Sequence, residues 1–304
     1  KEIEVPAGTT VIRAADELGI RIPRFCWHPD LAVDGNCRMC QVEVEKMPKL
    51  QIACNTQVTE GMVVHTTSPR AKEAQRTTLE FLLVNHPIDC PVCDQAGECY
   101  LQDQYMGHGL YGSKVELEDK VHKRKVVDLG PIMLDAERCV LCSRCLRFER
   151  EVTGTNLLEF VNRGDHTQIS TFENGPITHE YAGNLADVCP VGALLSRDFR
   201  FKMRVWFLKE HESVCPGCST GCNITVDERD GEVQRLRPGL HLLSGAGCNV
   251  VAWSGPDGAV LVDSGTAAAA PQLLEAVARL APDGVSFVVN TQWHPDHTGG
   301  NERL

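Results

Sequence analysis

Hydrophobic and polar positions alternate with short periods over the first 78 residues, which predicts a small domain of strands and helices. Alternation over 40–44 and over 62–66 predicts two strands, and 1–5 reads as the end of another. A threonine caps a predicted helix over 11–18, and Gly19 ends it. The pattern therefore favours an α+β domain.

Helix and strand signals of the same kind recur later in the chain. Ser68-Pro69 puts a capping hydroxyl before a proline, which predicts a helix running to about Asn85. Near the other end, the pattern predicts a strand over 260–262, a helix over 270–280 and a strand over 285–289. Alternating elements of this kind are typical of an αβ fragment.

A predicted hairpin and a change of composition separate these regions. Residues 223–226 and 232–235 are predicted to pair around a turn at Asp230-Gly231. After about Gly239, alanine and glycine become more frequent. The shift marks a boundary between two kinds of sequence.

Charge and cysteine content narrow the function classes. The 304 residues carry a net charge of −11, whereas a nucleic-acid partner requires a basic face. We find no signal peptide and no apolar run of the ~20 residues that a membrane helix needs. The chain opens at Lys1 without methionine, so we expect a fragment. Its 15 cysteines lie mostly at two-residue gaps, which in a reducing compartment predicts metal ligands.

The first cysteine group has the spacing C-x10-C-x2-C-x13-C and consists of Cys26, Cys37, Cys40 and Cys54. Plant-type ferredoxins use C-x4-C-x2-C and a distant fourth cysteine. The order of loop, C-x2-C motif and strand is the same in this chain, although its first gap is longer. Four thiolates could also hold a structural zinc ion.

The second group has the spacing H-x3-C-x2-C-x5-C and consists of His86, Cys90, Cys93 and Cys99. One imidazole and three thiolates are a common zinc ligand set. They would equally hold a [4Fe–4S] cluster with one histidine ligand. Replacing a thiolate by a neutral imidazole changes the net charge of the cluster and therefore its reduction potential. The spacing leaves both open, and the neighbouring groups favour iron.

The third group is a C-x2-C-x2-C motif, Cys139, Cys142 and Cys145, with a remote Cys189-Pro190. Bacterial two-cluster ferredoxins add a cysteine three residues after the motif, and that cysteine ligates the other cluster. Here Glu149 has that position. We therefore predict a ferredoxin-like module with one of its two clusters lost and Cys189 as the fourth ligand.

Two further stretches carry possible ligands. One is a C-x2-C-x3-C motif, Cys215, Cys218 and Cys222, for which Cys248 is the remaining candidate fourth ligand. The other, residues 292–301, contains two histidines and an aspartate after a predicted strand, a pattern that suits a hydrolytic metal site.

Three stretches carry a resemblance to a known family: residues 86–99, 183–194 and 197–206. With them, about residues 1–240 resemble the iron–sulfur G subunit of bacterial NADH-quinone oxidoreductase, respiratory complex I. The resemblance implies one [2Fe–2S] cluster at the first group, [4Fe–4S] clusters at the second and third, and an additional, third [4Fe–4S] cluster at Cys215.

The resemblance also implies a function and partners. The chain would relay electrons from a flavin and NADH-binding subunit toward quinone, among other peripheral-arm subunits at the cytoplasmic face of the inner membrane. It would be a subunit of an enzyme without a complete active site of its own, because it lacks a glycine-rich dinucleotide fingerprint. The alternatives are the same relay in an NAD-linked hydrogenase or formate dehydrogenase, a structural zinc protein, and a metallo-hydrolase.

The last residues depart from that family. Residues 245–301 resemble the start of a metallo-β-lactamase fold protein, but Gln292 has the place of the first motif histidine. The join near residue 240 is open to two interpretations, a natural fusion or an artefact of sequence assembly. Cys248 could be a ligand of the fourth cysteine group or could belong by ancestry to the lactamase-like segment.

We thus expect an α+β multidomain chain in five parts. They are a β-grasp 2Fe–2S ferredoxin domain (1–78), a helical His-Cys 4Fe–4S segment (79–118), a ferredoxin-like 4Fe–4S domain (119–210), a small molybdopterin-oxidoreductase-type 4Fe–4S domain (211–240) and an incomplete metallo-β-lactamase-like fragment (241–304).

Overall fold

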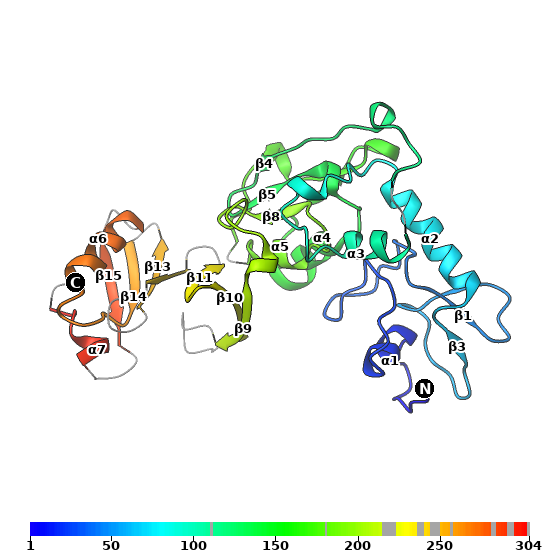
Figure 1. Cartoon of the computed structure of the whole chain (residues 1–304), viewed down its shortest axis with the longest axis horizontal. Helices are drawn as coiled ribbons and strands as arrows, with labels where there is room; N and C mark the ends of the chain where they lie inside the picture. Colours follow the sequence, from blue (N-terminus) through cyan, green and yellow to red (C-terminus); the bar gives the residue numbers. More distant parts are fainter. Residues whose placement is uncertain are drawn as a thin grey trace. The chain divides into compact units, whose positions relative to one another are not determined.

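The computed structural model divides the chain into two compact units, residues 1–201 and 202–304 (Figure 1). The described residues are 1–109, 112–179, 181–214, 223–235, 240–243, 250–255, 258–280, 284–290 and 295–302. Each unit has its own hydrophobic clusters, so each is described by itself.

The first unit begins with a three-stranded antiparallel sheet in the order β2-β1-β3. The strands are β1 (Gln41–Val44), β2 (Gln51–Ile52) and β3 (Val64–His65). Alternate residues of β1 are buried against helix α1 (Val11–Glu17). The strand predicted over 1–5 is wrong: these residues are mostly exposed and have no regular structure.

The helix predicted from Ser68-Pro69 is confirmed as α2 (Pro69–Leu83), and it packs on β1 (Figure 1). Ser68 Oγ accepts a hydrogen bond from the Ala71 amide at 3.2 Å, which caps the first turn. One residue in every four is buried along the helix: Ala71, Gln75, Leu79 and Leu83. The Gln75 side chain donates to the Gln41 carbonyl at 2.9 Å and so ties the helix to the sheet.

Short elements make up the rest of the first unit. The helices and helical turns are η1 (Cys90–Val92), α3 (Tyr100–Gly107), η2 (Leu117–Asp119), η3 (Ala136–Arg138), α4 (Arg144–Phe148), η4 (Glu149–Thr153), η5 (Gly164–His166), η6 (Phe172–Asn174) and α5 (Asn184–Val188). The strands are β4 (Val127–Asp128), β5 (Ile132–Leu134), β6 (Glu159–Val161), β7 (Gln168–Ser170) and β8 (Leu194–Ser196).

Two small antiparallel sheets organise this part, one in the order β4-β5-β8 and one formed by β6 and β7. A hydrophobic cluster joins them to α4 and α5 through buried side chains such as Ile132, Leu158, Ile169 and Leu185. This part of the chain contains little regular structure. The conformation of its cysteine-bearing loops therefore depends on packing and on hydrogen bonds between distant segments.

The described residues of the second unit form two sheets. Its elements are η7 (Val205–Phe207), β9 (Lys209–Val214), β10 (Asn223–Arg229), β11 (Glu232–Arg235), β12 (Leu240–Leu243), β13 (Val250–Gly255), β14 (Gly258–Val262), α6 (Ala270–Leu280), β15 (Val285–Val289) and α7 (Pro295–Thr298). The predicted hairpin at Asp230-Gly231 is confirmed as β10 and β11, beside β9.

The other sheet has the order β12-β13-β14-β15, with β14 and β15 parallel. Helix α6 connects these two strands and packs its Leu273 and Val277 against Leu261. The predicted strand–helix–strand pattern is therefore confirmed. No described helix is long and apolar enough to cross a membrane.

Candidate metal centres

The first cysteine group comes together around loops of the N-terminal sheet, and we call it the Cys26 site. Cys26, Cys40 and Cys54 are buried, and Cys37 is half-buried. The Cys26 amide donates to Cys37 Sγ at 3.4 Å. Cys40 directly precedes β1 and Cys54 follows β2, so pairing of the two strands brings distant cysteines to one place.

Thiol–thiol hydrogen bonds connect the Cys26 site. The thiols of Cys37 and Cys54 donate to the Cys26 sulfur and lower the Cys26 pKa to about 2. The same bonds raise the pKa values of both donors, and Cys54 also donates to Cys40. Converging soft donors of this kind suit an iron–sulfur cluster.

The second group lines one pocket of about 410 Å³, part of it open to solvent, and we call it the His86 site. Its ligand candidates are His86, Cys90, Cys93 and Cys99. The turn η1 carries Cys90, and Cys99 directly precedes α3. The predicted residues therefore meet although the chain between them makes only one short helical turn.

The imidazole of His86 has the properties of a metal ligand. Within the described part of the chain, His86 Nδ1 is buried without a hydrogen-bond partner. Burial lowers the His86 pKa to about 4, which keeps the ring neutral near neutral pH. A neutral ring with an unused nitrogen is the form of histidine that binds metals.

The thiols of the His86 site hold their protons strongly. Burial raises the pKa of Cys99 to about 12, and it also raises the pKa values of Cys90 and Cys93. Gly192 completes the wall, because a Cβ there would lie 2.4 Å from Cys93 Sγ. Buried thiols of this kind lose their protons only when a metal compensates the charge, so the residues fit a bound metal group.

The third group lines a second pocket of about 330 Å³, and we call it the Cys139 site. Its candidates are Cys139, Cys142, Cys145 and Cys189. Leu141 and Ser143 have left-handed backbone conformations, with φ of 53° and 62°, which fold the motif into a tight loop. Burial raises the pKa values of all four thiols, those of Cys139 and Cys142 to about 12.

The geometry bears on the zinc alternative. Considering the described residues alone, no three or more His, Cys, Asp or Glu side chains are arranged around a single ion. In each of the two pockets, four candidate ligand side chains line the wall. The described cysteines form no disulfide, so their sulfurs remain available as ligands.

Glu149, at the position of the missing ferredoxin cysteine, is fully buried. It accepts a hydrogen bond from Thr155, and its Oε1 lies 2.8 Å from His179 Nε2. Sequence reasoning missed His179, although the spacing contained the signal. Counting back from Cys189-Pro190 by the ferredoxin rule gives positions 185, 182 and 179, which hold leucine, alanine and histidine. Glu149 and the half-buried His179 therefore pair at two positions where a two-cluster ferredoxin has cysteines.

Several predicted residues lie outside the described residues. They are Cys215, Cys218, Cys222, Cys248, Gln292 and His294. The fourth cysteine group and the hydrolase-like motif therefore remain predictions from sequence.

Comparison with protein families assigns cluster-binding domains along the first unit. Residues 1–69 match the 2Fe-2S iron-sulfur cluster binding domain, and residues 75–114 match the NADH-ubiquinone oxidoreductase-G iron-sulfur binding region. Residues 130–195 match the ferredoxin-like domain of NADH-quinone oxidoreductase subunit 3. The chain thus contains one 2Fe–2S and several 4Fe–4S binding domains, as predicted.

The second unit matches two other families. Residues 208–240 match the molybdopterin oxidoreductase Fe4S4 domain, and residues 244–304 match the metallo-beta-lactamase superfamily. Both matches follow the boundary near residue 240 that composition predicts.

Similar whole proteins support the assignment. The NADH-quinone oxidoreductase G subunit of Streptomyces coelicolor is 48% identical over 236 residues, 77% of this chain and 28% of that protein. The mitochondrial NADH dehydrogenase [ubiquinone] iron-sulfur protein 1 of Solanum tuberosum is 46% identical over 243 residues, 79% of this chain and 32% of that protein. The chain therefore spans about a third of these relatives.

One solved structure has a similar fold. A chain of an NAD+-reducing [NiFe]-hydrogenase in the H2-reduced state matches with a TM-score of 0.59 and 29% identity, covering 67% of this chain and 86% of that one. Together with the family matches, this structural similarity supports an iron–sulfur multidomain α+β fold for the chain. About residues 1–240 of this chain belong to the family of the iron–sulfur G subunit of NADH-quinone oxidoreductase.

Proposed function

We propose that this chain is an electron relay in which the Cys26, Cys139 and His86 sites hold iron–sulfur clusters in one path. The clusters would supply one-electron carriers, and the protein would fix their spacing and environment. One observation carries the proposal: a single hydrophobic cluster contains ligand candidates of all three sites. They are Cys26 and Cys37, Cys99, and Cys139, Cys142 and Cys189.

Hydrogen bonds between the sites support a middle position for the Cys139 site. Toward the Cys26 site, Asn36 donates to the Leu141 carbonyl at 3.3 Å, and Arg147 donates to the Cys26 carbonyl. Toward the His86 site, the Tyr100 amide donates to the Pro190 carbonyl at 3.0 Å. The loop of the middle site thus contacts both neighbours directly.

The wider function follows from the family. We infer that the electrons come from a flavin and NADH-binding subunit and continue toward quinone within a multisubunit complex, at the cytoplasmic face of the membrane. The chain has no glycine-rich dinucleotide fingerprint, so a partner would oxidise NADH. Cys215, Cys218, Cys222 and Cys248 are proposed to hold a further 4Fe–4S cluster.

The finer domain division is part of this proposal. We assign 1–78 as a β-grasp 2Fe–2S domain, 79–118 as the His-Cys segment and 119–210 as the ferredoxin-like domain. Residues 211–240 would form the small 4Fe–4S domain, and 241–304 a metallo-β-lactamase-like fragment. The antiparallel β2-β1-β3 sheet with α1 and α2 supports the first assignment.

A relay in an NAD-linked hydrogenase is the second candidate, because a hydrogenase chain shares 29% identity and the fold. The relatives named as G subunits of NADH-quinone oxidoreductase are closer in sequence, at 42 to 48% identity. Isolation of the native complex would decide between them, since quinone reduction and hydrogen oxidation are separate assays.

Metal and sulfide analysis tests the relay itself. After anaerobic reconstitution of the full chain, we expect iron with acid-labile sulfide, and binuclear and cubane signals in low-temperature electron paramagnetic resonance (EPR). Zinc without sulfide would contradict the proposal and leave a structural protein.

A further inference from the structure

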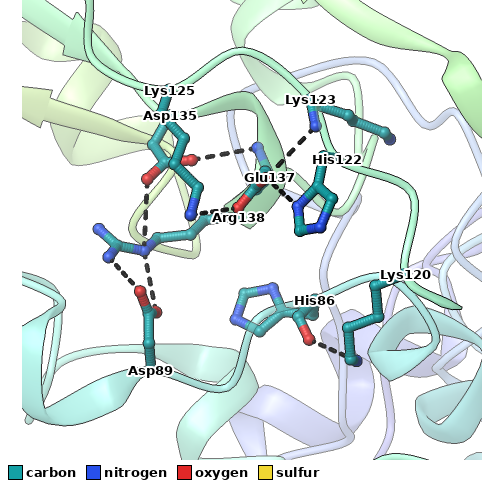
Figure 2. Close-up of polar contacts among 9 residues, drawn as sticks. All are labelled: His86, Asp89, Lys120, His122, Lys123, Lys125, Asp135, Glu137 and Arg138. Carbon is teal, nitrogen blue, oxygen red and sulfur yellow. Dashed lines mark hydrogen bonds and ion pairs between the residues drawn. The ribbon is translucent and has the colours of Figure 1, made fainter. Parts of the chain in front are cut away.

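A charged bridge joins the ligand loops of the His86 and Cys139 sites. Asp89 directly precedes Cys90, a ligand candidate of the His86 site, and Arg138 directly precedes Cys139. Arg138 Nε and Nη2 donate to the two Asp89 oxygens at 3.1 and 2.7 Å (Figure 2). One bidentate ion pair therefore connects the two loops at the residues next to their ligands.

This pair is more buried than exposed pairs such as Arg150–Glu159, whose side chains are 51% and 48% exposed. The Arg138 side chain is 7% exposed and that of Asp89 29%. Asp135 Oδ2 lies 3.6 Å from Arg138 Nε as a second, weaker partner. Ion pairs shielded from water interact more strongly than exposed pairs, because the effective dielectric constant is lower.

Neighbouring charges have partners of their own. Glu137, the residue before Arg138, interacts with Lys125 Nζ at 2.6 Å and with His122 Nδ1 at 3.0 Å (Figure 2). The Arg138 charge is thus balanced mainly by Asp89, with Asp135 as its weaker partner, so a change at either member of the Arg138–Asp89 pair alters the net charge beside the two ligand loops.

The bridge also borders the His86 site itself. Asp89 lines the same pocket as Cys93, and Gly192 forms part of the wall of that pocket. A Cβ on Gly192 would lie 2.4 Å from Cys93 Sγ and 3.6 Å from Arg138 Cδ. The side chain of Arg138 therefore passes close to a ligand sulfur of the His86 site.

We propose that Arg138 and Asp89 are positioning residues whose ion pair sets the reduction potential of the cluster at the His86 site relative to that at the Cys139 site. This inference rests on the proposed function. Charge near a cluster is one of the factors that set its potential.

The signs of the effects follow from electrostatics. A reduced cluster carries one more negative charge, so a nearby cation stabilises the reduced form and raises the potential. Arg138→Met removes the cation and leaves the Asp89 carboxylate, which lowers the potential. Asp89→Asn removes the anion and leaves the guanidinium, which raises it. A bridge with only a mechanical role would give shifts of the same sign, since both variants break the same pair.

The test is an EPR-monitored redox titration of the reconstituted full chain. The signal of the His86 site is first assigned with Cys93→Ala, which removes it. The variants are Arg138→Met, Asp89→Asn and both together. The control is Arg150→Met, which breaks an exposed ion pair with Glu159, 2.8 Å long, in the same unit.

We expect opposite shifts from the two single variants and an intermediate value from the double variant. Each single change should alter the electron-sharing equilibrium between the two sites about tenfold, or about 59 mV for one electron. The signal of the His86 site should move more than that of the Cys139 site. If Arg138→Met fails to load a cluster, Asp89→Asn alone tests the inference, because the inference requires that this variant raise the reduction potential at the His86 site.

Shifts of equal sign, or shifts no larger than that of Arg150→Met, would overturn the inference. The proposed function fails separately, if the wild-type chain takes up no iron and sulfide.

Discussion

The His86 and Cys139 sites differ in the charges around them. Asp89 lines the first site, Arg138 pairs with Asp89, and Lys120 donates to the His86 carbonyl, while the candidate ligands include an imidazole. The second site offers four thiols in a mostly apolar lining that includes one buried charged residue, Arg144. We infer that the Arg138–Asp89 pair tunes the first site, whereas the loop of the second site, which contacts both neighbouring sites, is the structural centre of the unit.

The largest effect should come from removing a ligand of the central site. Cys145→Ser should lose about four iron atoms, the content of one cubane cluster, and should destabilise residues 1–201 as a whole, because the Cys139 loop contacts both neighbouring sites. Cys93→Ser should lose a similar amount of iron with a smaller loss of stability. Iron analysis and thermal unfolding measure both. Equal destabilisation by the two variants would contradict the inference that the Cys139 site, and not the His86 site, is the structural centre of the unit.

A single methyl group should prevent assembly of the His86 site. Gly192→Ala would place a Cβ 2.4 Å from Cys93 Sγ, so the sulfur must move out of its ligating position. We expect loss of the His86-site EPR signal while the Cys139-site signal remains. Gly107→Ala is the matched control, because nothing lies within 4 Å of its Cβ. A normal signal in Gly192→Ala would contradict the assigned ligand geometry.

Arg147 should contribute strongly to stability although it ligates nothing. Its buried guanidinium donates to the carbonyls of Cys26 and Ala32 and, at 3.1 Å, to Ser143 Oγ. Arg147→Met leaves these acceptors unpaired and should reduce the free energy of unfolding by about 3 kcal/mol. The exposed Arg150→Met should reduce it by less than about 1 kcal/mol. Denaturant titration measures the difference, and equal losses would refute the central role of the Cys139 loop.

Lys120 should have a smaller, local effect. Its buried ammonium donates to the carbonyls of Leu83, Val84 and His86 at 3.1, 2.9 and 2.8 Å, where α2 ends. Lys120→Met should therefore reduce stability by about 2 kcal/mol and increase hydrogen exchange at the end of α2. The control Lys114→Met removes only an exposed pair with Glu80 and should reduce stability by less than about 0.5 kcal/mol. Unchanged exchange at the end of α2 would contradict the role of Lys120.

The short-gap cysteine motifs could be recognised from sequence because their spacing is local. Cys139, Cys142 and Cys145 lie within seven residues, and the left-handed Leu141 and Ser143 fold that segment into a tight loop. The helices and the hairpin at Asp230-Gly231 could also be predicted, since caps and turn residues specify them locally.

The arrangement of the sites could not be predicted, because it depends on contacts between distant residues. Arg144 donates to the Trp27 carbonyl 117 residues away, and Arg147 to the Cys26 carbonyl 121 residues away. No local pattern specifies such pairs. The failed strand at 1–5 has a similar cause, since its pairing partner would have to come from elsewhere in the sheet, and Thr10 pairs with Gln57 instead.

Removal of the middle cluster tests the central claim most directly. Rapid-freeze EPR would follow reduction of the full chain in the wild type and in Cys145→Ser, recording the signals of the Cys26 and His86 sites. If the Cys139 site connects the other two, the wild type equilibrates electrons between them quickly, and the variant does so much more slowly while keeping both clusters. Equally fast equilibration in the variant would contradict a path through the Cys139 site.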